Sequence, residues 1–187
     1  MLFSIIIPTY NNVNSISDAI SSCIAQENSF NDYEIVVVNN NSNDGTEKIV
    51  EKFISNRLTL YHNATTVSMY ENHNIGLKYA KGDYIIYCHA DDKLADDSLL
   101  KISYILKERN FPNKFVVWGR SFFRDFYSNY KLSGARVNEI IAGKSAISTF
   151  MYGGLTPSGT CYHRQSFLNA GGFVICNNKL APSDSVS

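Results

Sequence analysis

The chain alternates between short apolar runs and longer segments in which apolar residues recur every three or four positions. The short runs predict buried strands: Leu2–Ile7, Tyr33–Val38, Leu58–Tyr61, Tyr84–Cys88 and Phe115–Trp118. The segments between them predict four helices. The first is capped by Asn14 or Ser15 and runs to about Gln26, and the second is opened by Asp44, which forms a capping box with Glu47. The third covers Asn72–Lys81, and the fourth is capped by Asp96 or Asp97 and runs to about Asn110. Strands that alternate with helices predict an α/β domain with a mainly parallel central sheet.

The pattern is less regular after Gly119, although it still reads as part of one domain. The segment Ser121–Leu132 predicts either a strand pair or irregular structure. Three further elements are predicted: a helix over Lys144–Tyr152, a strand over Thr160–His163 and a short helix over Gln165–Ala170. We therefore treat residues 1–187 as a single domain, with residues 1–118 as its regular half and residues 119–187 as its second half.

Polar turns follow three of the predicted strands, at Thr9–Asn12, Asn39–Asp44 and His89–Asp92. The carboxyl ends of parallel strands open on one edge of a sheet, where ligands bind in open α/β folds. The three turns together predict a cleft for a polar, phosphorylated ligand. Neither a dinucleotide-binding glycine motif nor a P-loop is present, so those two nucleotide folds are not supported.

Two adjacent carboxylates, Asp91 and Asp92, end the fourth apolar run. They have two readings at this point. Carboxylate oxygens are preferred ligands of hard divalent cations, so the pair predicts a metal site. Aspartate also favours turns and helix N-caps, so the pair could simply open the next helix.

The bulk composition excludes some classes of function. Lysine plus arginine and aspartate plus glutamate both number 17, so the formal net charge is zero, which argues against a general nucleic-acid binder. The four cysteines form no Cys-x-x-Cys pair, which argues against a zinc site or a disulfide framework and favours a reducing compartment. No apolar run reaches transmembrane length, and the N-terminal run reads as a strand and not as a signal peptide. A cytoplasmic protein is therefore expected, and peripheral contact with a membrane stays open.

Several ordered motifs together resemble the family 2 glycosyltransferases, which have the GT-A fold. The motifs are Ser4-Ile5-Ile6-Ile7-Pro8-Thr9-Tyr10-Asn11, Glu34–Thr46, the Asn-x-Gly signature Asn74–Ile85, His89-Ala90-Asp91-Asp92 in place of Asp-x-Asp-Asp, and Ala170-Gly171-Gly172-Phe173. The resemblance covers residues 2 to about 173. It implies a Rossmann-type three-layer sandwich, with a nucleotide-binding half in residues 1–118 and a truncated acceptor-side half in residues 119–187.

The resemblance also implies an activity. A sugar would pass, with inversion, from a nucleotide-diphosphate donor, expected to be a UDP-sugar, to a hydroxyl of a glycan or lipid-linked saccharide. A divalent ion, Mn²⁺ or Mg²⁺, would stabilise the charge on the leaving diphosphate. The setting would be cytoplasmic, at the inner face of the membrane where the acceptor is lipid-linked.

The resemblance implies roles for individual residues, as follows. Asp91 would ligate the metal, with Asp92 beside it. Tyr10 would lie against the nucleobase, Pro8 and Thr9 would line that pocket, and Asn40 would accept a hydrogen bond from a uracil N–H. His73 and His89 would lie near the diphosphate and ribose.

The resemblance also implies roles in the second half of the chain. Thr156, Ser158 and Gly159 would border the sugar or acceptor, and Asp184 would be the catalytic base.

The chain also departs from the family pattern. Asn39 and Asn40 replace acidic residues, and His89 replaces the first aspartate of Asp-x-Asp. A neutral imidazole can ligate a metal or form a hydrogen bond with a ribose hydroxyl. His73 and His89 could equally be hydrogen-bonded or solvated side chains without a catalytic part. Asp184 could be a disordered tail residue. A non-catalytic nucleotide-sugar-binding module is thus the main alternative, and a sugar nucleotidyltransferase is disfavoured because residues 8–14 hold no glycine-rich phosphate loop.

Overall fold

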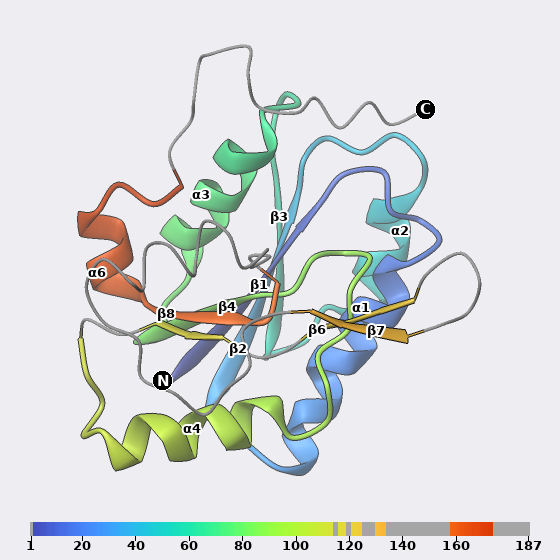
Figure 1. Cartoon of the computed structure of the whole chain (residues 1–187). Coiled ribbons are helices and arrows are strands. Elements are labelled where there is room, and N and C mark those ends of the chain that lie inside the picture. Colours follow the sequence, from blue (N-terminus) through green and yellow to red (C-terminus); the bar gives the residue numbers. More distant parts are fainter. Residues whose placement is uncertain (1, 114–115, 119–120, 125–129, 134–157, 174–187) are drawn as a thin grey trace.

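The protein is an α/β sandwich built on one six-stranded sheet. The computed structural model describes residues 2–113, 116–118, 121–124, 130–133 and 158–173 (Figure 1). The strands of the sheet run in the order β3 (Leu58–His62), β2 (Tyr33–Asn39), β1 (Phe3–Thr9), β4 (Tyr84–Tyr87), β8 (Thr160–His163) and β5 (Val116–Trp118). A separate two-stranded sheet pairs β6 (Ser121–Arg124) with β7 (Tyr130–Ser133), which confirms the strand-pair reading of that segment.

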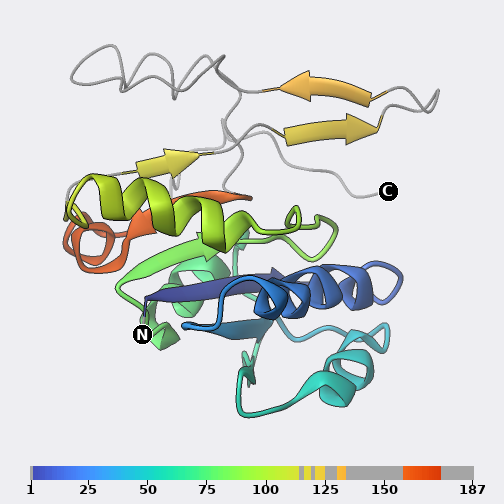
Figure 2. The ribbon, with the colours of Figure 1, turned by 90° about the horizontal axis from the view of Figure 1, so that it is seen from below.

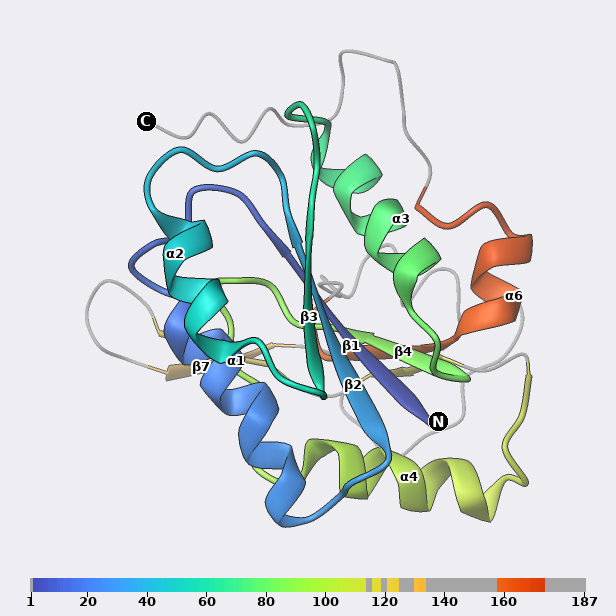
Figure 3. The same cartoon turned by 180° about the vertical axis from the view of Figure 1, so that it is seen from behind.

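Parallel pairing brings the carboxyl ends of neighbouring strands to one edge of the sheet. The strand β1 pairs in parallel with both β2 and β4, and β2 pairs in parallel with β3. The register sets Thr9 opposite Asn39 and Asn39 opposite His62. Figure 3 shows the loops after β1 and β2 beside each other at that edge. The mainly parallel sheet is confirmed, and only β8 runs antiparallel to its neighbours.

Helices cover both faces of the sheet, which confirms the three-layer arrangement. The helices and short 3₁₀ turns are α1 (Ile16–Ile24), η1 (Ala25–Asn28), α2 (Thr46–Val50), η2 (Glu51–Phe53), α3 (Met69–Tyr79), α4 (Ser98–Glu108) and α6 (Arg164–Asn169). The helices α1 and α4 contribute to one apolar cluster, whereas α3 and α6 contribute to the other. Figure 2 shows α1 in blue and α4 in yellow-green together on the near side of the strands.

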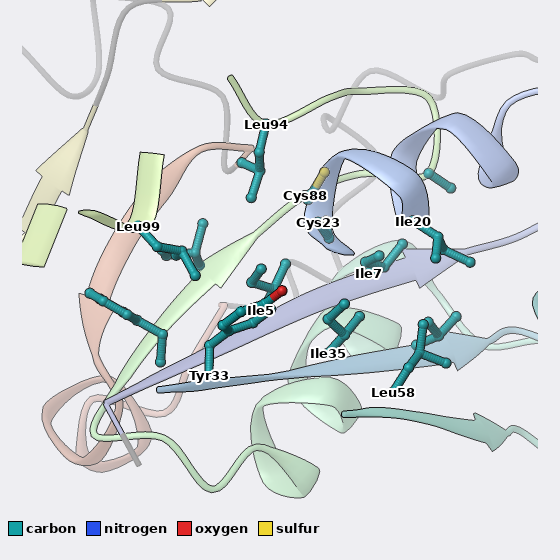
Figure 4. Packing of buried hydrophobic residues seen from close by; sticks show 14 of the residues in the cluster. Ile5, Ile7, Ile20, Cys23, Tyr33, Ile35, Leu58, Cys88, Leu94 and Leu99 are labelled. Carbon is teal, nitrogen blue, oxygen red and sulfur yellow. The ribbon is translucent and has the colours of Figure 1, made fainter. Parts of the chain in front are cut away.

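The strand residues alternate between the two clusters because successive side chains of a strand point to opposite faces. Ile5 and Ile7 pack with Ile20 and Cys23 of α1 (Figure 4), whereas Ile6 packs with Leu77 of α3. Both faces are apolar, so the strands read as continuous hydrophobic runs in the sequence. The three described cysteines, Cys23, Cys88 and Cys161, are buried and unpaired, as expected for small hydrophobic side chains.

Two glycines of the Asn-x-Gly signature allow helix α3 and its following turn to approach β1. A Cβ atom on Gly76 would lie 2.4 Å from Ile6 Cγ2, and one on Gly82 would lie 2.5 Å from the Ser4 amide nitrogen. The Ser4 hydroxyl accepts from the Gly82 amide at 2.7 Å and donates to Glu34 at 2.6 Å. These motif residues therefore fix α3 against the sheet.

Several boundary predictions were wrong. Helix α3 begins at Met69, not at Asn72, because the Ser68 hydroxyl caps it by accepting from the Glu71 amide at 3.3 Å. Strand β1 continues through Pro8 to Thr9. Pro8 is tolerated because the pairing between β1 and β4 ends at Ile6, so the missing N–H of Pro8 has no partner to lose there. Ser15 is the N-cap residue of α1, as predicted, but it makes no side-chain cap bond, and the caps expected for two further helices also differ.

Neither Asp44 nor Asp97 caps a helix through its side chain. The predicted capping box with Glu47 is absent, because Asp44 bonds Thr46 and Val13 instead, and Gly45 is the N-cap of α2. Asp97 does occupy the N-cap position of α4, but it makes no side-chain cap bond and pairs with Lys101 at 2.8 Å. The predicted helix over Lys144–Tyr152 lies outside the described residues.

Candidate functional site

The loops after β1 and β2 are cross-linked by hydrogen bonds, and we call residues Thr9–Val13 and Asn39–Thr46 the paired loops. The Asn12 amide donates to Thr46 Oγ1 at 2.8 Å, and the Val13 amide donates to Asp44 Oδ2 at 3.0 Å. The Asn11 amide donates to the Ser42 hydroxyl at 3.0 Å. The short polar side chains of these turns therefore satisfy each other's backbone and set the loops before any ligand arrives.

Within the paired loops, Asp44 is the charged hub. Loss of solvent raises its pKa, but hydrogen bonds from the Thr46 hydroxyl and from the Val13 and Thr46 amides outweigh this, so its pKa is lowered overall. Thr46 itself is fully buried. Asp44 is thus held as an anion that organises backbone donors and hydroxyls.

Asn40 belongs to a network of buried amides behind the paired loops. Its Oδ1 accepts from the Val67 amide and from Asn63 Nδ2, both at 2.9 Å, and its Nδ2 donates to the Val67 carbonyl at 2.9 Å. Asn63 also donates to Asn72 Oδ1 at 2.8 Å. Both acceptor positions of the Asn40 oxygen are used within the chain, so this oxygen could accept from a base only by releasing one of these bonds.

The residues His89–Asp92 form a tight turn after β4, which we call the acidic turn. The Asp92 amide donates to the His89 carbonyl at 3.0 Å, and Ala90 is buried beneath the turn. Asp91 and Asp92 are exposed. Helix α4 begins only at Ser98, so the alternative in which this pair caps the next helix was wrong.

The acidic turn brings three ligand-bearing side chains together. Donor atoms of His89, Asp91 and Asp92 all lie within 4.8 Å of one another. His89 Nδ1 is 3.7 Å from Asp92 Oδ2, which is too long for a hydrogen bond. One imidazole nitrogen and two carboxylates are a donor set that suits a divalent metal, so the residues fit the ion that the sequence motifs imply.

His73 and His89, which are distant in the sequence, are in direct contact. The two Nε2 atoms lie 2.9 Å apart, and His73 Nδ1 lies 2.7 Å from the Met69 carbonyl oxygen. His73 is 3% exposed, and its ring packs against those of Tyr87 and Phe173 at centroid distances of 5.1 and 5.3 Å. Both histidines are therefore hydrogen-bonded, and His73 is not solvated.

Burial keeps this pair neutral near neutral pH. Desolvation, reinforced by the neighbouring His89, lowers the pKa of His73 to about 4, although the bond to Met69 acts the other way. Desolvation also lowers the pKa of His89, while Asp92 and Asp91 oppose that change. Two uncharged imidazoles therefore lie beside the exposed carboxylates.

The described residues Ser158–Phe173, in the second half of the chain, include contacts to the acidic turn and α3. The His89 amide donates to the Ser158 hydroxyl at 3.2 Å, and the Gly159 amide donates to the Tyr87 carbonyl at 2.7 Å. Asn74 makes two bonds to Phe173, accepting from its amide at 2.8 Å and donating to its carbonyl at 2.9 Å. These contacts join the second half of the chain to the strand ends of the first.

The structure thus gathers most of the residues predicted for the site. Thr9 is buried, whereas Tyr10 is 49% exposed at the end of β1. Pro8, Asn40, His73, His89, Asp91 and Asp92 lie on β1, the paired loops, α3 and the acidic turn. Thr156 and Asp184 lie outside the described residues.

The sequence reading missed two members of the site. Asn63 was the first polar residue after β3, so the rule that identified the other turns applied to it as well. Asn72 was assigned only to a helix, and its buried amide gave no local signal because its partner comes from another element.

The class of fold to which the protein belongs is that of the GT-A glycosyltransferases. The structure superposes on that of Staphylococcus aureus TarS 1–349 in complex with UDP-GlcNAc with a TM-score of 0.68, at 23% identity over 91% of this chain and 48% of that one. It superposes on the mannosyltransferase PcManGT from Pyrobaculum calidifontis, in complex with GDP-Man and Mn²⁺, with a TM-score of 0.67 at 21% identity over 92% of this chain and 47% of that one.

Residues 4–161 match the model of glycosyl transferase family 2, and the chain belongs to that family. It is 31% identical over 118 residues to the poly(ribitol-phosphate) β-N-acetylglucosaminyltransferase TarS of S. aureus, which covers 59% of this chain and 20% of TarS. It is 35% identical over 107 residues to the Escherichia coli glucosyltransferase WfgD, which acts on α-D-GlcNAc-diphosphoundecaprenol, over 57% of this chain and 42% of WfgD. The matched region is therefore less than half of either relative.

No helix in the described ranges combines the length and the apolar character needed to cross a membrane.

Proposed function

We propose that the protein is an inverting, metal-assisted glycosyltransferase. It moves a sugar from a nucleotide-diphosphate sugar, with UDP as the favoured carrier, to a hydroxyl of a glycan or lipid-linked saccharide. The observation that carries this proposal is the meeting of the preset paired loops and the acidic turn at neighbouring strand ends. Family membership and the names of the relatives support the same reading.

The paired loops suit the nucleoside end of the donor. Tyr10 is half exposed at the end of β1 and offers an aromatic face for a base. Pro8 and Thr9 form the strand end behind it. The Asn40 amide bonds to the Val67 amide and carbonyl, and so fixes the segment around Val67 beside this strand end.

The acidic turn suits the diphosphate end. Asp91, Asp92 and His89 would hold the divalent ion, Mn²⁺ or Mg²⁺, which supplies positive charge next to the leaving diphosphate. The two carboxylates are exposed and face solvent, so they can meet a charged ligand without the cost of uncovering a buried group. His73 contacts His89, and the Nε2 atoms of the two rings lie 2.9 Å apart.

A carboxylate base must take the proton of the attacking hydroxyl, and we assign this role to Asp184. Ser158 and Gly159 border the sugar or the acceptor, because both are bonded to the backbone around the end of β4. We place the reaction in the cytoplasm, with contact to the membrane surface where the acceptor is lipid-linked. The unpaired state of the three described cysteines agrees with a reducing compartment.

Incubation of the purified chain with Mn²⁺, a panel of nucleotide sugars and a range of saccharide acceptors tests this proposal. Release of one nucleoside diphosphate that requires both metal and acceptor, with an inverted anomeric product by NMR, is the expected result. Calorimetric binding of a donor without any release of nucleoside diphosphate would instead identify a nucleotide-sugar-binding module.

A further inference from the structure

The contact between His73 and His89 fixes where the protons of both rings lie. Two ring nitrogens 2.9 Å apart must share a proton, because two lone pairs would repel each other. The Met69 carbonyl can only accept, so the proton near it belongs to His73 Nδ1. A neutral imidazole carries one N–H, so His73 Nε2 is an acceptor and His89 Nε2 is the donor.

His73 is held firmly enough to impose this arrangement. Its ring is almost completely buried, which disfavours a charged form, and it packs between the rings of Tyr87 and Phe173. The Tyr87 hydroxyl donates to the His73 backbone carbonyl at 3.1 Å and so ties this turn of α3 to β4. The acceptor that His89 meets therefore has a fixed position.

The consequence for His89 is that Nδ1 keeps its lone pair. This nitrogen lies 3.7 Å from Asp92 Oδ2, so two groups that only accept face each other across a gap beside Asp91. Ligands at roughly 2.0–2.3 Å from one ion would be drawn slightly closer together than these atoms are now. A cation between them would relieve the repulsion.

We propose that His73 is a positioning residue that holds His89 in its Nε2–H tautomer, so that His89 Nδ1 is a nitrogen ligand of the divalent ion beside Asp91 and Asp92. This inference rests on the proposed function, because that function is the reason to expect a divalent ion at this turn. A nitrogen donor shifts the ion preference away from Mg²⁺, which favours all-oxygen sites, and towards Mn²⁺ and especially Co²⁺. The replacement of an aspartate by His89 then changes which ion the site selects.

The first test reads the tautomers without any metal or donor. Long-range ¹H–¹⁵N NMR of the metal-free protein near pH 7.5 reports which nitrogen of each ring carries the proton. The expected result is Nδ1–H for His73 and Nε2–H for His89. A Nδ1–H signal for His89 overturns the proposal, whatever the protein's activity.

The second test measures ion binding by calorimetry in the absence of nucleotide sugar, with Co²⁺ absorption bands as an independent readout of nitrogen ligation. His89→Asp should lower the ratio of Co²⁺ to Mg²⁺ affinity at least tenfold. His73→Phe should weaken Co²⁺ binding by about tenfold, the lower end of the effect of removing a partner that orients a metal-bound histidine. An unchanged affinity ratio in His89→Asp, or unchanged Co²⁺ binding in His73→Phe, overturns the proposal.

A conservative variant separates positioning from mere filling of space. In His73→Gln the amide oxygen lies as many bonds from the backbone as His73 Nε2 does, and it can accept from His89, so Co²⁺ affinity should stay within about threefold of the parent. Affinity as weak as that of His73→Phe overturns the tautomer argument. His62→Gln, at an exposed histidine paired with Glu47, is the matched control. Correct metal binding without sugar transfer would leave this inference standing and refute the proposed function.

Discussion

The paired loops and the acidic turn lie at neighbouring strand ends, yet they use their polar groups in opposite ways. In the paired loops, side-chain oxygens of the second loop (Ser42, Asp44 and Thr46) accept hydrogen bonds from backbone amides of the first. The Thr46 hydroxyl also donates to Asp44. In the acidic turn, no hydrogen bond within the described part of the chain reaches the carboxylate of Asp91 or of Asp92, and the Cys88 thiol donates only to the Asp92 backbone carbonyl. The first region uses its polar groups to hold its two loops together, whereas the second leaves its two carboxylates exposed.

The largest effect should follow from neutralising the acidic turn. Asp91→Asn should lower the rate of sugar transfer on the order of 10³-fold, because it removes a charge that, in the proposed function, helps to hold the ion beside the diphosphate. Its free energy of unfolding should change by less than about 0.5 kcal/mol, since the side chain is exposed. Nucleoside-diphosphate release and urea unfolding measure the two quantities.

Asp97→Asn is the control for Asp91→Asn, because Asp97 has a partly exposed carboxylate that pairs with Lys101 in α4 and not with the acidic turn. It should leave the rate unchanged. An equal loss of activity in both variants would contradict the special role of the acidic turn.

Acid should weaken the fold through the histidine pair. The pKa of His73 is about 4 in the folded chain against 6.5 for an ordinary histidine, so the unfolded chain binds the proton first as the pH falls. The resulting stabilisation, about 3 kcal/mol, is complete above pH 6.5 and is lost progressively as the pH falls towards 4.

Urea unfolding of the metal-free protein at several pH values between 4 and 7.5 measures this loss. His73→Phe should flatten the curve, because the phenyl ring cannot titrate. His62→Gln should retain the parent's slope. A parent curve as flat as that of His73→Phe would show that His73 does not carry the pH dependence.

Breaking the hydrogen bonds between the paired loops should lower the free energy of unfolding without changing the affinity for a metal ion. Thr46→Val keeps the shape of a fully buried side chain but leaves the Asn12 amide and Asp44 without their hydroxyl partner. The free energy of unfolding should fall by about 2 kcal/mol. Calorimetric affinity for Co²⁺ should be unchanged.

Thr59→Val on the exposed face of β3 is the matched control, and it should be close to neutral in urea unfolding. A Thr46→Val protein as stable as the control would mean that the cross-links between the paired loops contribute little.

The smallest effect is expected at Tyr10, the residue proposed to contact the base of the donor. Tyr10→Ala should weaken nucleotide binding about fivefold, or ~1 kcal/mol, because one stacked aromatic face is lost. Tyr10→Phe should bind as the parent does. Calorimetry with UDP measures both, and Tyr104→Ala, which removes another exposed tyrosine, should have no effect.

The layers of the fold could be predicted from the sequence because each buried strand is marked by an apolar run within its own segment. The runs of β1, β2 and β4 are buried on both faces, so the strands and their polar ends were predictable. Helix α3 was placed three residues late because its first turn holds the exposed Met69, and the capping role of Ser68 was overlooked.

The internal contacts of the site were less predictable because they join elements that are distant in the sequence. The contact between His73 and His89 depends on how α3 packs over β4, and no spacing in the sequence encodes it. The saturation of Asn40 depends likewise on the segment around Val67. Motif resemblance located these residues, but it could not tell which of their bonds were already used.

The position of β8 has a consequence for how the chain must be handled. This strand comes from the second half of the sequence, yet it lies between β4 and β5 in the sheet. A chain that ended at Trp118 would leave one whole side of β4 with unpaired N–H and C=O groups, which invites strands of other molecules to pair there. The first half of the sequence is therefore expected to aggregate when it is made alone, and the late return of β8 protects the central strands from self-association.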